Sequence, residues 1–260
     1  MGIINTTPDS FYEGSRKNSA QTILNKVTQF VNEGVDIIDI GGYSSRPGAK
    51  HITEEEEIER IATSIQTIRQ KHTSILISID TFRSNVAKVA LENGANIIND
   101  ISGGQADSKI FSIAAEFSAP YIMMHMRGTP QNMQNNTTYD SLVKDLLFYF
   151  SKQIKTAKKH GVKDIIIDPG LGFSKTLDQN YEIVSKIDLL KTLEVPVLIG
   201  ASRKSMLYKL LDITANESLN ATTIINTIAL QNEANILRVH DVKEAVEARI
   251  ISTKIKTFNL

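Results

Sequence analysis

A set of lone polar residues follows short apolar runs along this chain, and its placement constrains the fold more than any other feature. A buried carboxylate, amide or imidazole is expensive unless something compensates it. When such residues recur after strands that are separated by helical segments, they converge on one rim of a closed parallel barrel, where such barrels do chemistry. The residues are Asn5, Asp39, Asp80, Asn99, His125, Asp168, Ser202 and His240.

The strand candidates are short and continuously apolar, as is typical of strands buried on both faces. They are residues 1–4, 35–40, 75–79, 95–98, 121–124, 165–167, 195–199 and 236–239. These runs, with helical patterns between them, predict an α/β fold, a (β/α)8 TIM barrel. The length of 260 residues agrees, because roughly 250 residues is typical of one such barrel. We expect residues 1–260 to form a single domain, although a barrel strand usually has residues ahead of it that seal the floor, and the first strand begins at residue 1.

Helix boundaries are marked by caps. Thr53 and Glu56 form a capping-box pattern ahead of isoleucines at helical spacing. The four glutamates 54–57 are expected to complement the helix dipole rather than to bind a metal. Three glycines follow helical stretches and suit C-cap positions: Gly34, Gly94 and Gly161.

Composition limits the classes of molecule that this chain is expected to bind. Lys plus Arg and Asp plus Glu are both 29, so no overall field concentrates nucleic acid or acidic membranes, and any anion needs a local cluster. The chain has 0 cysteines, which excludes disulfides and thiolate chemistry. It shows no span of roughly 20 apolar residues and no signal peptide. We expect a cytoplasmic, soluble protein that acts on small molecules.

Three segments are candidates for binding an anion. Residues 39–49 combine two glycines, hydroxyls and an arginine, which provide backbone freedom and donors. Arg203 and Lys204 lie at an expected helix start after the seventh strand, which suits an anion or a polar ring. Arg238 and His240 flank Val239 at the end of the eighth strand, near the region where barrels often bind phosphate. For the segment with Arg203 and Lys204 the alternative is a solvated basic turn.

The acidic residues suggest a second kind of site. Asp80 and Asp168 end strands, and Asn99 with Asp100 ends another. A carboxylate can accept two hydrogen bonds from the amino-amidine edge of a flat, nitrogen-rich heterocycle. For Asp39 and Asp100 the alternative is a helix cap.

Taken together, these motifs resemble the dihydropteroate synthases, and the resemblance covers essentially the whole chain. The matching segments are Met1 to Phe11, Asp39 to Gly42 with Ser45 to Gly48, Asp80-Thr81, Asn99-Asp100, Met124 to Gly128, Asp168 to Gly170 with Gly172-Phe173, Ser202 to Ser205, and Arg238 to Asp241.

The resemblance implies an enzyme of folate biosynthesis. Such an enzyme is a transferase that condenses 6-hydroxymethyl-7,8-dihydropterin pyrophosphate with 4-aminobenzoate and releases pyrophosphate by a dissociative displacement. It also implies a Mg²⁺ cofactor, a homodimer, and an aminobenzoate site that sulfonamides mimic.

Site roles carry over by motif. The pterin ring would be held by Asp80, Asn99, Asp168 and Lys204. The pyrophosphate would be held by Asn5, Arg238 and His240, with Mg²⁺ near Asn5. The aminobenzoate would be bordered by Ser45, Arg46, Pro47, Gly172, Phe173 and Ser205. A loop with Asp9 and Phe11 would close over the site.

After the two glycines the family usually has Glu, Ser and Thr, whereas this chain has Tyr43, Ser44 and Ser45. Ser45 keeps the hydroxyl, so the departure that changes charge and bulk is Tyr43. Two rival functions remain. A pterin-binding methyltransferase would not need the Ser202–Ser205 helix start or the Arg238 and His240 pair. A catalytically dead pterin-binding module would have lost catalytic positions that are intact here.

Overall fold

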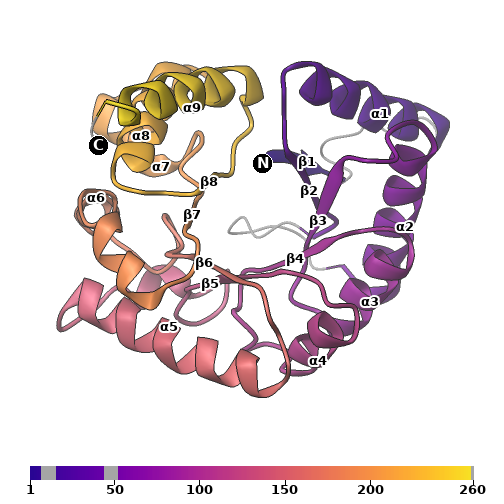
Figure 1. Ribbon diagram of the computed structural model, residues 1–260, viewed down its shortest axis with the longest axis horizontal. Helices are drawn as coiled ribbons and strands as arrows, with labels where there is room; N and C mark the ends of the chain where they lie inside the picture. The colour runs from indigo at the N-terminus through magenta and orange to yellow at the C-terminus, as the bar shows by residue number, and fades with distance from the viewer. Residues whose placement is uncertain (7–15, 44–51, 259–260) are drawn as a thin grey trace.

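The structure is a computed structural model that describes residues 1–6, 16–43 and 52–258, and for residues 16–19 it describes the backbone alone. Strands and helices alternate around a ring in this part of the chain (Figure 1). The strands are β1 (Gly2–Asn5), β2 (Ile37–Gly41), β3 (Leu76–Asp80), β4 (Ile97–Asp100), β5 (Tyr121–Met124), β6 (Ile165–Asp168), β7 (Leu198–Ile199) and β8 (Ile236–Leu237).

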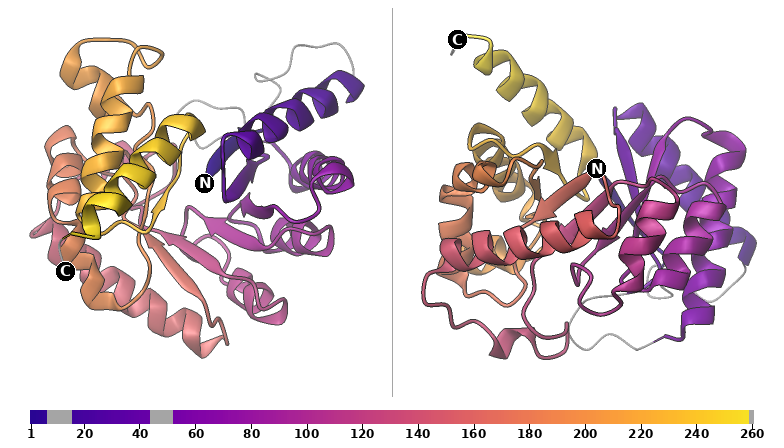
Figure 2. Two further views of the ribbon diagram at one scale, coloured as in Figure 1. Left: turned by 45° about the horizontal axis from the view of Figure 1, so that its top comes forward. Right: turned by 60° about the horizontal axis from the view of Figure 1, so that its bottom comes forward.

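The helices lie outside the strands, as two further views show (Figure 2). None of those described is long and apolar enough to cross a membrane. They are α1 (Arg16–Asn32), α2 (Glu54–Lys71), α3 (Ser84–Glu92), α4 (Lys109–Glu116), α5 (Leu142–Lys159), α6 (Leu177–Ser185), α7 (Ser205–Leu211), α8 (Leu219–Gln231) and α9 (Val242–Lys256), with short 3₁₀ segments η2 (Met133–Asn135) and η3 (Ile187–Leu193).

The strands close into a parallel barrel. Strands β1 to β6 pair in sequence order, and β7 pairs with β8. Single bridges complete the ring, Ile167 with Val197 between β6 and β7, and Gly2 with Val239 between β8 and β1. The Ile3 amide donates to the Val239 carbonyl at 2.9 Å across the second junction. The predicted TIM barrel is therefore confirmed.

Barrel interior and helix faces are both apolar. Ile38, Ile40, Ile77 and Ile79 of β2 and β3 are fully buried, as expected for strands that are covered on both faces. On α2, the isoleucines at helical spacing form the buried stripe that the sequence predicts: Ile61, Ile65 and Ile68.

The strand boundaries differ from the predicted ones by a few residues. The largest difference is at β7, where we expected 195–199 and the ladder covers only Leu198–Ile199. Pro196 lies inside the predicted run and has no amide N–H to donate, which shortens the ladder. Its carbonyl still accepts the Ile167 amide at 2.9 Å, so the chain there remains part of the barrel wall.

Helix ends agree with most of the cap predictions. Thr53 Oγ1 accepts the Glu56 amide at 3.2 Å at the start of α2, but the Glu56 carboxylate pairs with Arg60, so only the N-cap half of the predicted capping box forms. The predicted C-cap glycines all have positive φ, a conformation that glycine adopts without strain: Gly34 at 87°, Gly94 at 104° and Gly161 at 91°. A reciprocal capping box that the sequence analysis missed joins Thr176 and Gln179 ahead of α6.

Candidate active site

The strand register brings polar side chains to one end of the barrel. Asp80 lies beside Gly41 on one side and Asn99 on the other. Met124 pairs with Asp168 further round the ring. All of these positions are at the carboxyl ends of their strands, which define the mouth of a TIM barrel.

At the mouth, Arg238 joins two carboxylates. Its Nε donates to Asp39 Oδ2 and its Nη2 lies against Asp80 Oδ2, both at 2.6 Å. Asn99 Nδ2 lies 3.2 Å and 3.3 Å from the two Asp39 carboxylate oxygens. Residues from β2, β3, β4 and the end of β8 therefore form one hydrogen-bonded network.

Burial and neighbouring charges shift the pKa values of this network in opposite directions. Asp39 is fully buried, so its carboxylate depends on the Arg238 guanidinium for compensation. Burial raises the pKa of Asp80 to about 7, against the opposing effect of Arg238. Burial by itself would lower the pKa of Arg238, but Asp39 and Asp80 raise it above its ordinary value.

A second group lies between β6 and α7. Asp168 Oδ1 accepts the Gly170 amide at 2.7 Å, and Lys204 Nζ donates to the Leu171 carbonyl at 2.5 Å. The same ammonium lies 4.9 Å from the ring centroid of Phe173. Burial lowers the pKa of Lys204 to about 8, which Asp168 opposes. Burial also raises the pKa of Asp168, which Lys204 opposes.

The two groups are adjacent. A methyl group added at Gly200 would lie 3.8 Å from Arg238 Cβ and 3.9 Å from Lys204 Nζ. We call Asp80, Asn99, Asp168 and Lys204 the polar cup, because these four predicted residues offer carboxylate, amide and ammonium groups at one barrel mouth. Such a set can hydrogen-bond the edge of a flat heterocycle.

His240 and Ser202 lie on the same side of the mouth as Arg238. Ser202 Oγ is 3.1 Å from His240 Nδ1 and accepts the His240 amide at 3.1 Å. Ser205 is the first residue of α7, directly after Lys204. The predicted pairing of Arg238 with His240 at the end of β8 is thus placed beside the start of α7 as expected.

Arg203 does not contribute to an anion site in the way that the sequence suggested. Its guanidinium makes two contacts with Asp241, at 2.9 Å and 2.8 Å, and donates to the Ala215 and Asn216 carbonyls. The structure therefore gives Arg203 a role in joining the ends of β7 and β8 to the segment before α8. Its backbone there is left-handed, with a φ of 54°.

Asn5 ends β1 and is exposed. A methyl group added at Gly41 would lie 3.8 Å from both Asn5 Oδ1 and Asp80 Oδ2, so the glycine keeps the space between them open. The carboxamide oxygen is a hard ligand of the type that Mg²⁺ accepts alongside phosphate oxygens and water. Among the described residues, no group of three or more histidine, aspartate or glutamate residues forms a metal cluster.

Some predicted site residues lie outside the described residues. They are Asp9, Phe11, Ser45, Arg46 and Pro47. Gly172 and Phe173 are described and lie with Lys204: the Gly172 amide donates to Asn180 Oδ1 at 2.6 Å, and its carbonyl accepts from Gln134 at 3.2 Å.

The structure corrects the two helix-cap alternatives. Asp39 lies within β2 and pairs with Arg238. Asp100 ends β4, accepts from the Ser102 and Gly104 amides at 2.7 Å and 2.8 Å, and accepts the Tyr121 hydroxyl at 2.5 Å. The position of Asp39 inside an apolar run was the signal, because a carboxylate within a buried strand needs a cation.

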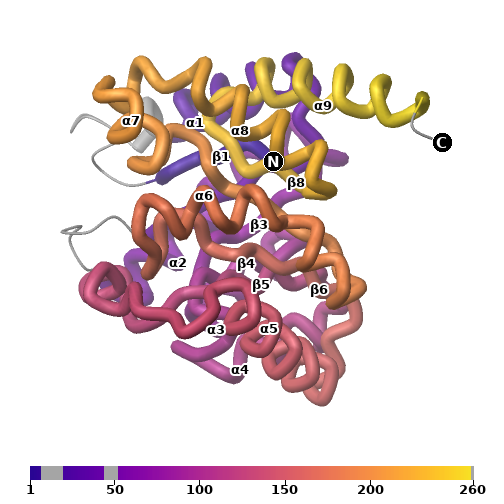
Figure 3. The backbone as a smooth tube through the Cα atoms, turned by 90° about the vertical axis from the view of Figure 1, so that its left-hand side faces the viewer, coloured from indigo at the N-terminus to yellow at the C-terminus, as the bar shows by residue number. Residues whose placement is uncertain are grey.

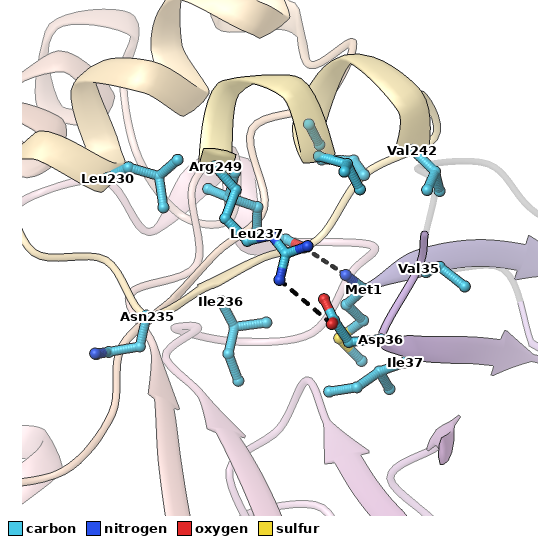
Figure 4. A pocket seen from close by; sticks show the side chains of 13 residues that line it. Met1, Val35, Asp36, Ile37, Leu230, Asn235, Ile236, Leu237, Val242 and Arg249 are labelled. Atoms are coloured by element: carbon cyan, nitrogen blue, oxygen red, sulfur yellow. Dashed lines mark hydrogen bonds and ion pairs between the residues drawn. The ribbon is translucent and has the colours of Figure 1, made fainter. Parts of the chain in front are cut away.

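A pocket of about 240 Å³ lies at the opposite end of the barrel (Figure 4). It is lined by the starts of β2 and β8, including Ile37 and Ile236. An Asp36 to Arg249 ion pair of 3.4 Å crosses it, and the Met1 amino group donates to the Leu237 carbonyl at 3.0 Å. Most of its lining is apolar, and its charged groups are already paired: Asp36 with Arg249, and the Met1 amino group with the Leu237 carbonyl.

Comparison with known proteins agrees with this geometry. A model of the family described as "Pterin binding enzyme" matches residues 1–240. A dihydropteroate synthase of Synechocystis sp. is 45% identical over 246 residues, which are 94% of this chain and 85% of the relative.

Two solved structures superpose closely. The dihydropteroate synthase of Clostridium difficile in the presence of pteroic acid has a TM-score of 0.92 at 34% identity and covers 98% of this chain and 95% of its own. That of Xanthomonas albilineans with 4-aminobenzoic acid has a TM-score of 0.91 at 31% identity, with coverages of 98% and 92%.

The chain therefore belongs to the pterin-binding enzyme family, as its barrel and polar mouth indicate. Within that family, relatives at 45%, 41% and 38% identity over nearly the full chain are dihydropteroate synthases, which are transferases. The resemblance found in the sequence is thus confirmed.

Proposed function

We propose that this chain condenses 6-hydroxymethyl-7,8-dihydropterin pyrophosphate with 4-aminobenzoate to give 7,8-dihydropteroate and pyrophosphate. The observation that carries the proposal is the polar cup beside Arg238, because it places heterocycle-binding groups next to a fixed cation. The related enzymes solved with pteroic acid and 4-aminobenzoic acid support the same substrates.

The polar cup binds the pterin ring in this proposal. Asp168 accepts from the amino-amidine edge, since a carboxylate accepts two parallel hydrogen bonds. Asn99 and Lys204 offer donors to ring nitrogen and oxygen acceptors. Asp80, with its pKa near 7, adds an acceptor whose charge favours the cation that forms as pyrophosphate leaves.

Pyrophosphate leaves toward Arg238, His240 and Asn5. The bond from the exocyclic carbon to the pyrophosphate oxygen breaks with its electron pair going to oxygen, and the electron-rich pterin delocalises the carbon's positive charge. Because Asp39 and Asp80 hold the Arg238 guanidinium at 2.6 Å, it is oriented before the substrate arrives. Such preorganised charge is usually the largest contribution to catalysis.

The amine nitrogen of 4-aminobenzoate then bonds to the exocyclic carbon, and the proton that it loses passes to water. An arylamine is weakly basic and its nitrogen lone pair is available near neutral pH, so the step needs no strong general base. Phe173, half-buried beside Lys204, forms an apolar wall for the benzene ring. Ser205, the first residue of α7 and the neighbour of Lys204, borders the same ring in this proposal.

A Mg²⁺ ion fits this site through the Asn5 carboxamide oxygen, with pyrophosphate oxygens and waters as its other ligands. When bound, it would neutralise charge on the leaving pyrophosphate. The exposed position of Asn5 at the mouth, next to the space that Gly41 leaves open, supports this assignment.

The test is the release of pyrophosphate from the pterin substrate, measured with and without 4-aminobenzoate and with excess chelator. We expect continuous pyrophosphate release only when 4-aminobenzoate is present. We also expect the rate of release to fall at least tenfold when the chelator removes Mg²⁺. Undiminished turnover in chelator would contradict the metal at Asn5. A methyltransferase or a binding module would release no pyrophosphate under any of these conditions.

We also propose a cytoplasmic homodimer and one domain over residues 1–260. A chain without cysteine is compatible with a reducing compartment. Exposed isoleucines on α8 and α9 support a second copy as the partner. Cell fractionation and sedimentation test the location and the dimer separately.

A further inference from the structure

Lys175 is a buried lysine that the proposed reaction does not use. It lies between β6 and α6 and is 3% exposed. Its ammonium has three partners: the Phe173 carbonyl at 2.9 Å, the Gly170 carbonyl at 3.1 Å and His125 Nδ1 at 3.1 Å. The ammonium donates to the ring nitrogen, so His125 accepts at Nδ1.

Both carbonyls belong to the segment that carries Asp168 of the polar cup together with Phe173. Residues 168–173 include Asp168, whose carboxylate faces Lys204, and Phe173, whose ring lies below the Lys204 ammonium. The third partner, His125, is fixed to the same segment, because its amide donates to the Asp168 carbonyl at 2.9 Å. Lys175 therefore connects the two ends of this loop to the end of β5.

The loop needs such a connection because its backbone is unusual. Gly170, Gly172 and Ser174 have φ values of 71°, 82° and 47°, and the last of these is strained for a residue with a side chain. A methyl group added at Gly170 would lie 2.1 Å from the His125 carbonyl oxygen. The backbone at Gly170 packs directly against the His125 carbonyl. The path of the loop therefore depends on the hydrogen bonds that fix it to His125.

Moving a lysine ammonium out of water costs free energy unless partners compensate it. We therefore expect the ammonium to have a role that an apolar side chain could not fill. Burial lowers the pKa of Lys175 to about 7, while Asp168 raises it. A methionine would fill the same space without that cost. The three directed hydrogen bonds are what the ammonium adds.

We propose that Lys175 is a positioning residue for the pterin site, which holds the Asp168 to Phe173 loop against His125 so that Asp168 and Phe173 meet the substrate. The proposal rests on the proposed function, since it concerns the pterin half of that site. Lys175 does not contact the reacting atoms; it acts through the loop.

The primary test is Lys175→Met, with the KM of each substrate measured separately. We expect the KM for the pterin pyrophosphate to rise at least tenfold. The catalytic rate at saturation should stay within about threefold, and the KM for 4-aminobenzoate should change by less than the pterin KM. If Lys175 served only the stability of the fold, Lys175→Met would lower the amount of active enzyme and would leave the KM of both substrates unchanged.

A chemical rescue gives a sharper readout. Because the chain has 0 cysteines, Lys175→Cys introduces one unique thiol. Alkylation of the unfolded variant with 2-bromoethylamine and refolding restores an ammonium at lysine length. We expect the alkylated protein to recover most of the pterin KM, whereas alkylation with iodoacetamide should not restore it.

The control is Val162→Ala, a buried substitution between α5 and β6 at the opposite end of the barrel. It should lower the melting temperature without changing either KM. If Lys175→Met fails to fold, the same comparison is made between the two alkylated forms of Lys175→Cys.

Four outcomes decide the matter. A raised pterin KM that aminoethylation restores supports the proposal. An unchanged pterin KM in folded Lys175→Met overturns it, as does equal recovery with both alkylating reagents. Wild-type protein that makes no dihydropteroate overturns the proposed function, and this inference falls with it. An unchanged pterin KM in an active enzyme overturns this inference alone, so the two failures are distinguishable.

Discussion

The guanidinium of Arg238 has two carboxylate partners before any substrate binds. Asp39 and Asp80 both lie at 2.6 Å from it, and its side chain remains 20% exposed. A charge that is already oriented costs no reorganisation when pyrophosphate leaves. The same carboxylates keep the arginine from turning away to solvent.

At the scale of single residues, the polar cup makes a first prediction. Lys204→Met and Asp168→Asn should weaken pterin binding about 10- to 100-fold, because a hydrogen bond to a charged group is worth about 1.5–3 kcal/mol. Titration calorimetry with 6-hydroxymethylpterin measures this. Lys186→Met, an exposed lysine paired with Glu182, is the matched control and should stay within twofold. Wild-type affinity in either cup variant would refute the assignment.

His125 makes the second residue-scale prediction, and it concerns pH. Burial and then Lys175 lower its pKa to about 2 in the folded protein, against about 6.5 in the unfolded chain. The unfolded state therefore binds more protons between pH 2 and 6.5, so this contribution to stability is lost as the pH falls below 6.5.

Urea unfolding between pH 7 and 5 measures the effect. His125→Asn keeps an acceptor and removes the titration, so its free energy of unfolding should fall with pH less steeply than that of the wild type. The difference in slope is at most about 1.4 kcal/mol per pH unit. The exposed His160 supplies the control, His160→Asn. Equal slopes for wild type and His125→Asn would contradict a buried neutral imidazole.

At the scale of elements, α2 and α3 are joined by a buried ion pair. Glu57 of α2 is fully buried and accepts from Arg83 at 2.7 Å and from Thr81 at 2.8 Å. Burial raises the pKa of Glu57, and its two partners oppose this. Arg83 also donates to the Ile52 carbonyl at 3.0 Å. The cluster thus fixes the start of α3 and the residue just before the N-cap of α2.

Removing the Arg83 guanidinium should lower the free energy of unfolding strongly. Arg83→Met leaves the Glu57 carboxylate buried without its partner, which typically costs about 3–5 kcal/mol. Glu57→Gln combined with Arg83→Met should recover more than half of that loss, because no charge remains. Arg60→Met breaks the pair with the half-exposed Glu56 and should cost about 0–1 kcal/mol. Chemical denaturation compares them, and similar losses for the two arginines would contradict the account.

The boundaries of strands and helices could be predicted from the sequence, whereas contacts between distant elements could not. The β-branched runs and the glycine caps identified the strands and helix ends to within a few residues, since both depend on local chemistry. The partners of Asp39 and Lys175 could not be found in this way. Arg238 is 199 residues from Asp39, and His125 is 50 residues from Lys175, so these contacts exist only once the barrel closes.

At the scale of the whole molecule, α8 and α9 lie side by side along one side (Figure 3). Both helices carry exposed apolar residues, which support the proposed contact with a second copy: Ile224, Ile228, Ile250, Ile251 and Ile255. Sedimentation should give twice the mass of one chain. Ile251→Glu combined with Ile255→Glu should sediment as a monomer and keep its fold by circular dichroism. A wild-type monomer would refute the dimer.

The resemblance in sequence, the closed barrel and the polar mouth all lead to one reaction. The most direct measurement is mass spectrometry of the product from 6-hydroxymethyl-7,8-dihydropterin pyrophosphate and ring-labelled 4-aminobenzoate. The account predicts labelled 7,8-dihydropteroate, with one pyrophosphate formed per product. At subsaturating pterin, the rate of both should fall about 10- to 100-fold in Asp168→Asn. Tight binding of the pterin without any labelled product in wild-type protein would contradict it.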